Sequence, residues 1–94
     1  MTPRQRQIMG APPIAEVKEY ARDYGFAVIT AGAGKKIEKG MGFAIRRGNA
    51  IIARVKVTEV EDGSAVVDVD PRSIPPGVII ETGDEVIQDL PPES

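Results

Sequence analysis

Residues 41–70 read MGFAIRRGNAIIARVKVTEVEDGSAVVDVD, and apolar and polar residues alternate along three successive runs of this stretch. Strict alternation places the apolar side chains on one face of a strand, so the stretch predicts three antiparallel strands. Two clusters of turn-forming residues, Arg47-Gly48-Asn49 and Glu61-Asp62-Gly63, separate the runs. This stretch therefore decides the fold class, which we predict to be all-β.

The second turn sets the register of its hairpin if Glu61-Asp62-Gly63 is a three-residue loop with Gly63 in the left-handed conformation. One face of the hairpin is then made of valines and the other of oppositely charged pairs, namely Val55–Val69, Val57–Val67, Arg54–Asp70 and Lys56–Asp68. Each such cross-strand pair contributes about 0.2–1 kcal/mol. A slip by one residue would lose both patterns, so we expect this register to be well specified.

The first turn, Arg47-Gly48-Asn49, is also predicted to be a three-residue loop. A two-residue turn would set Phe43 against Arg54 and break the alternation, whereas the longer loop sets apolar residues against each other. The resulting apolar pairs are Phe43–Ala53 and Ile45–Ile51. The predicted inward face consists of Phe43, Ile45, Ile51, Ala53, Val55, Val57, Val67 and Val69.

Three apolar residues point outward in this register, namely Ala44, Ile52 and Val66. Apolar side chains that gather on the outer face of a small barrel indicate that something covers them. We therefore predict these three as partner-contact residues. The cover is expected to be either the N-terminal segment of the chain or another protomer.

The remainder of the chain is predicted to complete a small six-stranded antiparallel barrel, closed or partly open, over residues 14–88. Further strands are expected at residues 26–31 and 85–88. A flexible arm is expected at residues 1–13, and a disordered tail at residues 89–94.

The composition, with 41% hydrophobic and 28% charged residues among 94, fits one small globular domain. The absence of cysteine and histidine excludes disulfides and thiolate metal sites, and it removes the commonest general base at neutral pH. No run approaches the roughly 18 apolar residues of a membrane helix, so no membrane insertion is expected. Residues 1–13 lack the apolar core of a secretory leader, so we expect a cytoplasmic location unless a leader precedes Met1.

Charge is distributed unevenly along the chain. Residues 1–47 carry nine Lys or Arg and four Asp or Glu, a balance of +5, whereas residues 48–94 carry three and ten, a balance of −7. In the simpler interpretation the two halves interleave in the folded sheet and largely cancel. In the other, a dipolar surface steers self-association or a charged partner.

The acidic residues form a possible metal site on composition alone, because clustered carboxylates bind Ca²⁺ or Mg²⁺. The candidates are Glu59, Glu61, Asp62, Asp68 and Asp70. Asp68 and Asp70, however, face cations in the predicted register. A glycosidase would need an aromatic-lined cleft, and only 4% of the residues are aromatic. We therefore predict no enzyme, no catalytic, metal-binding or cofactor-binding residues, no cofactor and no small-molecule substrate.

Basic residues gather near two turns, namely Lys35, Lys36, Lys39, Arg46 and Arg47. Small barrels often bind single-stranded nucleic acid through basic surfaces, so nucleic-acid binding at these turns is the alternative function. The net charge of −2 and the scarcity of aromatic stacking residues argue against it.

Four segments resemble a small bacterial β-barrel module, namely YGFAVITAG at residues 24–32, IEKGMGFAIRRG at 37–48, IARVKVTEVEDGSAVVDV at 52–69 and IETGDEVI at 80–87. The relatives of this module are the C-terminal barrel of flagellar assembly protein T and the β-domains of the rod-shape-determining protein C family. The resemblance covers residues 14–87. It implies a non-catalytic interaction module of cell-envelope assemblies, and it brings no catalytic residues.

Residues 14–24 have a helical periodicity, but a strand-like run follows them directly, so the residues alone leave helix and strand open. The resemblance implies a strand at residues 14–20 that pairs with residues 26–31. The function predicted from the sequence is a protein–protein interaction or scaffolding module. Its partner is expected to be another protein or a second copy of the chain, bound by surface complementarity or by strand addition at an open edge.

Overall fold

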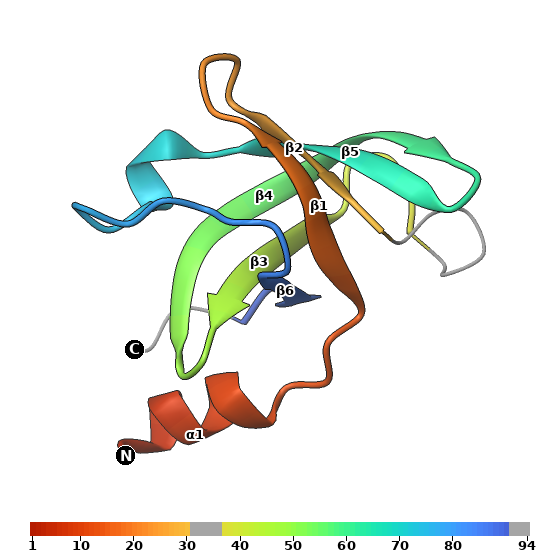
Figure 1. Ribbon diagram of the computed structural model, residues 1–94. Coiled ribbons are helices and arrows are strands. Elements are labelled where there is room, and N and C mark those ends of the chain that lie inside the picture. Colours follow the sequence, from red (N-terminus) through yellow and green to blue (C-terminus); the bar gives the residue numbers. More distant parts are fainter. Residues whose placement is uncertain (31–36, 91–94) are drawn as a thin grey trace.

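The computed structural model describes residues 1–30 and 37–90 of the chain. Its elements there are α1 Pro3–Gly10, β1 Ala15–Ala21, β2 Phe26–Ile29, β3 Gly42–Arg47, β4 Ala50–Glu61, β5 Ser64–Val69, the 3-10 helix η2 Pro71–Ser73 and β6 Glu85–Gln88. The strands form a closed antiparallel barrel in the order β1-β2-β5-β4-β3-β6 (Figure 1). The predicted all-β, six-stranded antiparallel barrel is confirmed, in its closed form.

Strand β1 occupies the segment for which helix and strand were left open. It pairs with β2 on one side and with β6 on the other. Ala15 and Val17 lie in the core, and Glu16 and Lys18 are exposed, which is the alternation of a strand. The register then shifts after Val17, so that Tyr20, three residues further on, also packs against the core.

Both turns of the β3–β4–β5 meander contain two residues, not the three that the sequence predicted. The ladder closes across Gly48-Asn49 in the first hairpin and across Asp62-Gly63 in the second. Each turn contains one glycine with a positive φ, 63° at Gly48 and 79° at Gly63. In each hairpin the predicted loop is therefore one residue too long.

A register shift occurs in each hairpin, with one extra residue in β4, and in the second hairpin it restores the pairing that the sequence predicts. In the second hairpin, three predicted pairs are observed, namely Val55–Val69, Val57–Val67 and Lys56–Asp68. In the first hairpin the predicted pairs are wrong, because Phe43 faces Val55 and Ile45 faces Ala53. The bulge in the second hairpin thus offsets the shorter turn, whereas the bulge in the first hairpin moves the pairing one residue further from the predicted register.

The bulge in the first hairpin brings Ile52 into the barrel core. A bulge interrupts strict alternation, and Ile52 and Ala53 are both in the core cluster, 4% and 0% exposed, while Ile51 is only partly buried. The predicted outward position of Ile52 and inward position of Ile51 are therefore wrong. The other predicted inward residues are buried, namely Phe43, Ile45, Ala53, Val55, Val57, Val67 and Val69.

Strand β3 is buried on both of its faces. Phe43 and Ile45 point into the core, and Ala44 and Arg46, which alternate with them, are also buried, at 0% and 4% exposure. Residues 1–13, where we expected a flexible arm, include the helix α1, which lies beneath the β3–β4 turn (Figure 1). Within the described part of the chain, no helix has the length and apolar character needed to cross a bilayer.

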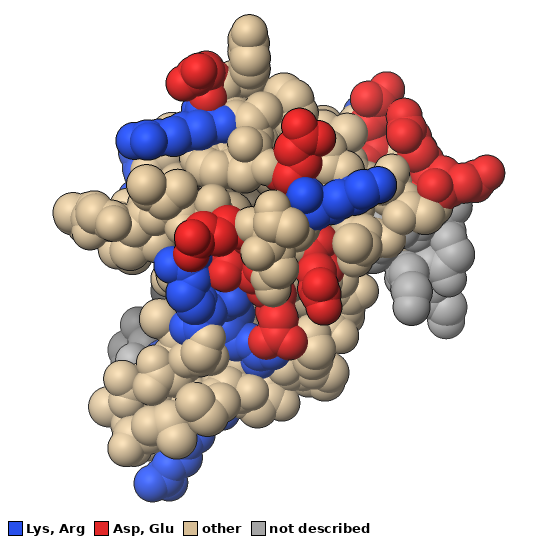
Figure 2. Space-filling view, in the orientation of Figure 1, with Lys and Arg blue, Asp and Glu red and all other residues tan. Residues whose placement is uncertain are grey.

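Charged residues from the two halves of the chain interleave on the surface. Figure 2 shows basic and acidic side chains next to one another across the middle of one face, and an acidic group at the end of the β4–β5 hairpin. Three ion pairs join the two halves of the chain, namely Arg46–Glu85, Arg47–Glu81 and Arg47–Asp84. These pairs support the simpler interpretation of the charge asymmetry, in which the two halves largely cancel.

Candidate interaction surface

The three predicted contact residues do not come together as one exposed patch. Ala44 points outward but is fully buried, and its cross-strand neighbours are Ile87 and Arg54. Ile52 lies in the core. Val66 stays on the outer face, where it is half-buried opposite Val28 of β2. The surface predicted from Ala44, Ile52 and Val66 is therefore not available as such.

Arg46 holds the C-terminal end of α1 against the barrel. Its Nη1 donates hydrogen bonds to three carbonyl oxygens, those of Ile8 at 2.6 Å, Met9 at 3.1 Å and Ala11 at 2.6 Å. Its Nη2 donates to Oε1 of Glu85 at 2.8 Å. The last carbonyls of a helix lack hydrogen-bond partners within the helix and carry partial negative charge. A buried guanidinium supplies both the hydrogen-bond donors and the positive charge.

The N-terminal end of α1 is closed by a capping box. The Thr2 hydroxyl accepts from the Gln5 N–H at 3.1 Å, and the Gln5 side chain accepts from the Thr2 N–H at 2.8 Å. Arg4 then donates to the carbonyl of Leu90 at 3.4 Å. α1 is thus attached to the residues that follow β6 as well as to β3.

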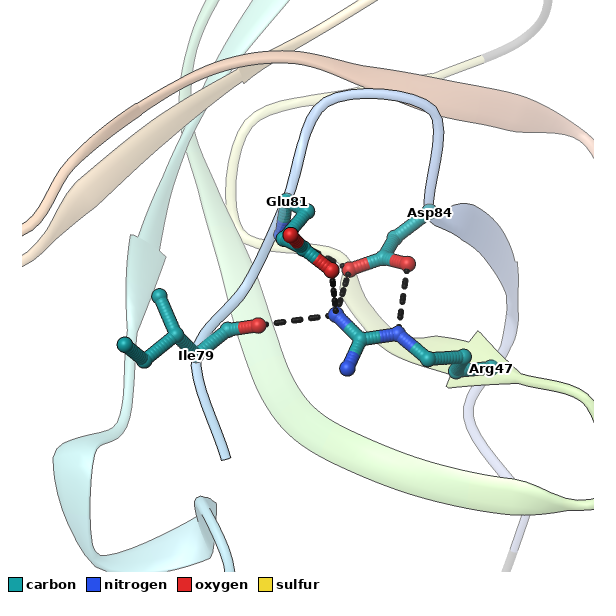
Figure 3. A network of polar contacts seen from close by, with 4 residues as sticks. All are labelled: Arg47, Ile79, Glu81 and Asp84. Atoms are coloured by element: carbon teal, nitrogen blue, oxygen red, sulfur yellow. Dashed lines mark hydrogen bonds and ion pairs between the residues drawn. The ribbon is translucent and has the colours of Figure 1, made fainter. Parts of the chain in front are cut away.

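Arg47, next to Arg46 in the chain, ties the β5–β6 connection to the end of β3 (Figure 3). Its Nε and Nη2 donate to the two carboxylate oxygens of Asp84 at 3.0 and 2.7 Å. Nη2 also donates to the Ile79 carbonyl at 2.8 Å and lies 3.4 Å from Oε2 of Glu81. This fork-shaped geometry is the strong form of an arginine–carboxylate pair.

The same contacts shift two pKa values in opposite directions. Hydrogen bonding to Asp84 raises the pKa of Arg47, against a smaller effect of burial. Burial alone would raise the pKa of Asp84, whose side chain is 9% exposed. Hydrogen bonds from Arg47 and the Glu81 N–H, together with the charge of Arg47, outweigh burial and lower the pKa of Asp84 below its ordinary value.

The basic turns expected to bind nucleic acid are not assembled into one cationic surface in the described residues. Lys35 and Lys36 lie outside those residues, and Lys39 is exposed. Arg46 and Arg47 are both engaged with carboxylates and carbonyls of the chain itself. A phosphate backbone would have to displace these internal partners to reach either arginine.

The acidic residues considered as a metal site are dispersed. Glu59, Glu61 and Asp62 are exposed near the end of the β4–β5 hairpin, and Asp70 accepts from the N–H of Arg72 at the start of η2, at 3.0 Å. The predicted cross-strand ion pair of Asp70 with Arg54 is wrong at the side-chain level, because Arg54 pairs with Asp89. Within residues 1–30 and 37–90, no three acidic side chains converge in a way that could hold a metal ion.

A groove of about 610 Å³ lies between the end of β6 and the segment that joins α1 to β1. Its lining residues are Arg6, Gln7, Gly10, Ala11, Pro12, Ile14, Gln88 and Leu90. Small and apolar residues make up most of this lining, and one arginine and two glutamines supply the polar groups. Sequence reasoning missed the groove because it exists only where α1 docks.

The groove lies where the barrel seam between β1 and β6 ends. The last hydrogen bond of this seam runs from the Ile14 N–H to the Val86 carbonyl at 2.9 Å, and the preceding Pro12 and Pro13 have no N–H to continue it. Alternate residues of a strand direct their backbone groups to the same side. The N–H and C=O of Gln88 therefore point toward the β1 side of β6, as the carbonyl of Val86 does. On that side, Gln88 has no backbone partner within residues 1–30 and 37–90, so β6 presents a free edge there.

Comparison of the chain with protein-family models, with curated proteins and with solved structures finds no match. The interpretation of the groove therefore rests on its own geometry.

Proposed function

We propose that this barrel is a non-catalytic protein-interaction module that binds its partner in the groove between α1 and β6. The observation that carries this proposal is the coincidence of an apolar groove of about 610 Å³ with the free backbone edge at Gln88. Apolar walls supply the affinity of such sites, and a few polar groups fix the orientation of what is bound. The free backbone edge at Gln88 lies beside this groove, so this end of the seam is a specific place for recognition.

Three carboxylates that already have partners within the chain support a non-catalytic function. Asp84, Glu85 and Asp89 each pair with an arginine of the chain. The pKa shift of Asp84 is explained by its contacts with Arg47 and Glu81, which hold two parts of the fold together. A general acid or base needs a titratable group that faces a substrate cleft, and these groups face each other instead.

An interaction module is also what the resemblance to barrels of bacterial envelope assemblies implies. A location in such an assembly is therefore part of the proposal. Binding of nucleic acid is the less favoured function, because Arg46 and Arg47 already have internal partners.

The proposal is tested by photo-crosslinking in the cells that produce the chain. Benzoylphenylalanine is placed at Gln7, an exposed residue of the groove, and in a second variant at Arg72, whose side chain is 92% exposed outside it. We expect one defined protein adduct from the Gln7 position and none from the Arg72 position. Identical adducts from both positions, no adduct, or an adduct to nucleic acid would each overturn the proposal.

A pair of substitutions at Gly10 controls for the groove itself. A Cβ at Gly10 meets no atom within 4 Å, so a larger side chain can enter the groove without a backbone clash. An excess of the chain with Gly10→Ala should compete away the Gln7 adduct. An excess of the chain with Gly10→Trp, which fills the groove, should not compete.

A further inference from the structure

We infer that the groove accepts an extended peptide segment that carries a carboxylate, added as a short strand to β6 with Arg6 as the partner of that carboxylate. This inference rests on the proposed function and specifies the chemistry of the partner. Three observations support it, namely the free backbone edge at Gln88, the small apolar wall of the groove and the positive charge of Arg6 beside that wall.

The backbone edge defines the conformation of the bound segment. The N–H and C=O of Gln88 point to the side where β1 ends, and they are one donor and one acceptor at strand spacing. An extended segment satisfies both at once, which is the main-chain contact of strand addition. A helix has already used its own backbone groups and cannot do so.

The wall defines the side chains that fit. Ala11, Pro12, Ile14 and Leu90 line the groove with small or medium apolar surface. Alternate side chains of a bound strand point to one side, so every second residue of the segment would face this wall. The volume of about 610 Å³ lies within the usual range of binding pockets, and it admits only a few residues. The segment is therefore short, with apolar residues at alternate positions.

The charge at the edge of the groove determines the charge of the segment that fits. Arg6 lines the groove and is exposed, and its guanidinium forms no ion pair within residues 1–30 and 37–90. Arg4, the other arginine of α1, is already engaged with Gln7 and Leu90. A single guanidinium beside an apolar wall matches a carboxylate, which it binds through two parallel hydrogen bonds. A basic segment would meet like charge at this position.

The inference is tested with a phage-displayed library of random heptapeptides selected on the immobilised chain of residues 1–94. We expect the selected peptides to alternate β-branched or other apolar residues with polar ones and to share one Asp or Glu. A synthetic peptide of the selected sequence should shift the backbone amide signal of Gln88 in the NMR spectrum. Its backbone nitrogens are methylated in two separate peptides, at the odd-numbered positions in one and at the even-numbered positions in the other. One of the two peptides should lose binding, because the edge needs an N–H donor.

Charge is tested with a matched pair of arginine substitutions. Arg6→Glu should weaken binding of the synthetic peptide by about tenfold or more, because it sets like charges against each other. Arg22→Glu changes an exposed arginine between β1 and β2, outside the groove, and should change affinity by less than about twofold. Equal effects of the two substitutions would overturn the inference.

Other occupants give distinct results. Selected peptides rich in Lys or Arg, or a failure to select any peptide, would also overturn the inference. So would a library that yields peptides only when it is selected on a chain shortened to end at Leu90, since that result assigns the groove to the chain's own following residues. If the Gln7 position still yields its protein adduct while acidic peptides show no preference, the inference alone fails and the proposed function stands.

Discussion

At the scale of single residues, Arg46 and Arg47 show how neighbours in sequence can serve different parts of a fold. Arg46 is 4% exposed and holds α1 by its terminal carbonyls. Arg47 has a side chain that is 41% exposed, and it holds the loop that leads into β6. Both were read from the sequence as cations available to a ligand. Their internal partners come from α1 and from residues 79–85, which are far away in the chain.

Replacement of Arg46 by Met should release α1. The change keeps an unbranched stem in the buried site but removes the guanidinium that satisfies the helix carbonyls. We expect the free energy of unfolding to fall by about 2–3 kcal/mol, since hydrogen bonds to a charged group are lost. Hydrogen exchange of the α1 amides should accelerate more than that of the β4 amides. Arg22→Met, at an exposed position, should stay within about 0.5 kcal/mol.

The contact between Arg47 and Asp84 makes stability depend on pH in the acid range. The folded pKa of Asp84 is below its ordinary value of 3.8, so the unfolded chain binds the proton more tightly. The resulting stabilisation is present above pH 3.8 and is lost as the pH falls through the lower folded pKa. Asp84→Asn should therefore cost about 1–2 kcal/mol at neutral pH, given the partial exposure of Arg47. The difference from the unsubstituted chain should shrink when denaturant titrations are repeated below pH 3.8.

At the scale of elements, the turns and bulges of β4 act together. In each hairpin the two-residue turn shifts the register by one residue from the predicted one. The bulge shifts it back in the β4–β5 hairpin, and in the β3–β4 hairpin it shifts it by one more residue, which again sets apolar residues against each other. The valine face predicted for β4 and β5 is preserved by this compensation. The outward position predicted for Ile52 is wrong because the bulge turns this side chain into the core, whereas strict alternation would place it outside.

Gly63→Ala should destabilise the β4–β5 hairpin by about 1 kcal/mol, because Gly63 has a φ of 79° that alanine adopts at a cost. Gly10→Ala is the matched control, since Gly10 lies in α1 without a positive φ and with free space around a new Cβ. We expect no loss of stability from that control, and a small gain from helix propensity. Thermal unfolding of both variants checks the difference. Equal losses would contradict the conformational explanation.

The strands could be predicted because alternation reports burial on one face, and β6 at Glu85–Gln88 was placed with its observed bounds. The bulges were not predicted, because a break in the alternation, such as Ile52-Ala53 or Thr58-Glu59, does not by itself distinguish an extra residue from a change in burial. The helix α1 did leave a signal. Thr2-Pro3-Arg4-Gln5 has the capping-box residues at the required spacing and a proline at the first helical position, and we read it instead as a flexible arm.

The candidate site could not be predicted from the sequence in the same way. Ala44 and Val66 were correctly placed on the outer face, but burial by other parts of the chain cannot be read from a strand pattern. The groove joins residues 6–14 to residues 88–90, and only the docking of α1 by Arg46 brings them together. Neither segment has a distinctive composition.

At the scale of the whole molecule, the barrel is one ring in which each strand depends on two neighbours. Most strands adjacent in the chain are also adjacent in the ring, but β2 pairs with β5 and β3 pairs with β6. Such long-range pairings make folding slow relative to helical proteins of the same size and make unfolding cooperative.

An unpaired charge at the seam should therefore unfold the entire barrel and not only its last strand. Val86 is fully buried in the core, and Val86→Asp places a carboxylate there without a partner. We expect the β-sheet signal in circular dichroism to be lost as a whole. Gln88→Ala, two residues away at an exposed position, should leave the signal unchanged. Protected amides that persist in β4 and β5 of the Val86→Asp variant would contradict a single cooperative unit.

The position of β6 between β1 and β3 also sets an order in time. While the chain emerges from the ribosome, β1 to β5 can form their hairpins, but β1 and β3 each keep an open edge until residues 85–88 appear. The ring closes only then, so the nascent chain passes through a stage with two adhesive edges. The barrel can therefore close only after residues 85–88 have been synthesised, and chaperones would act on it in the interval before that.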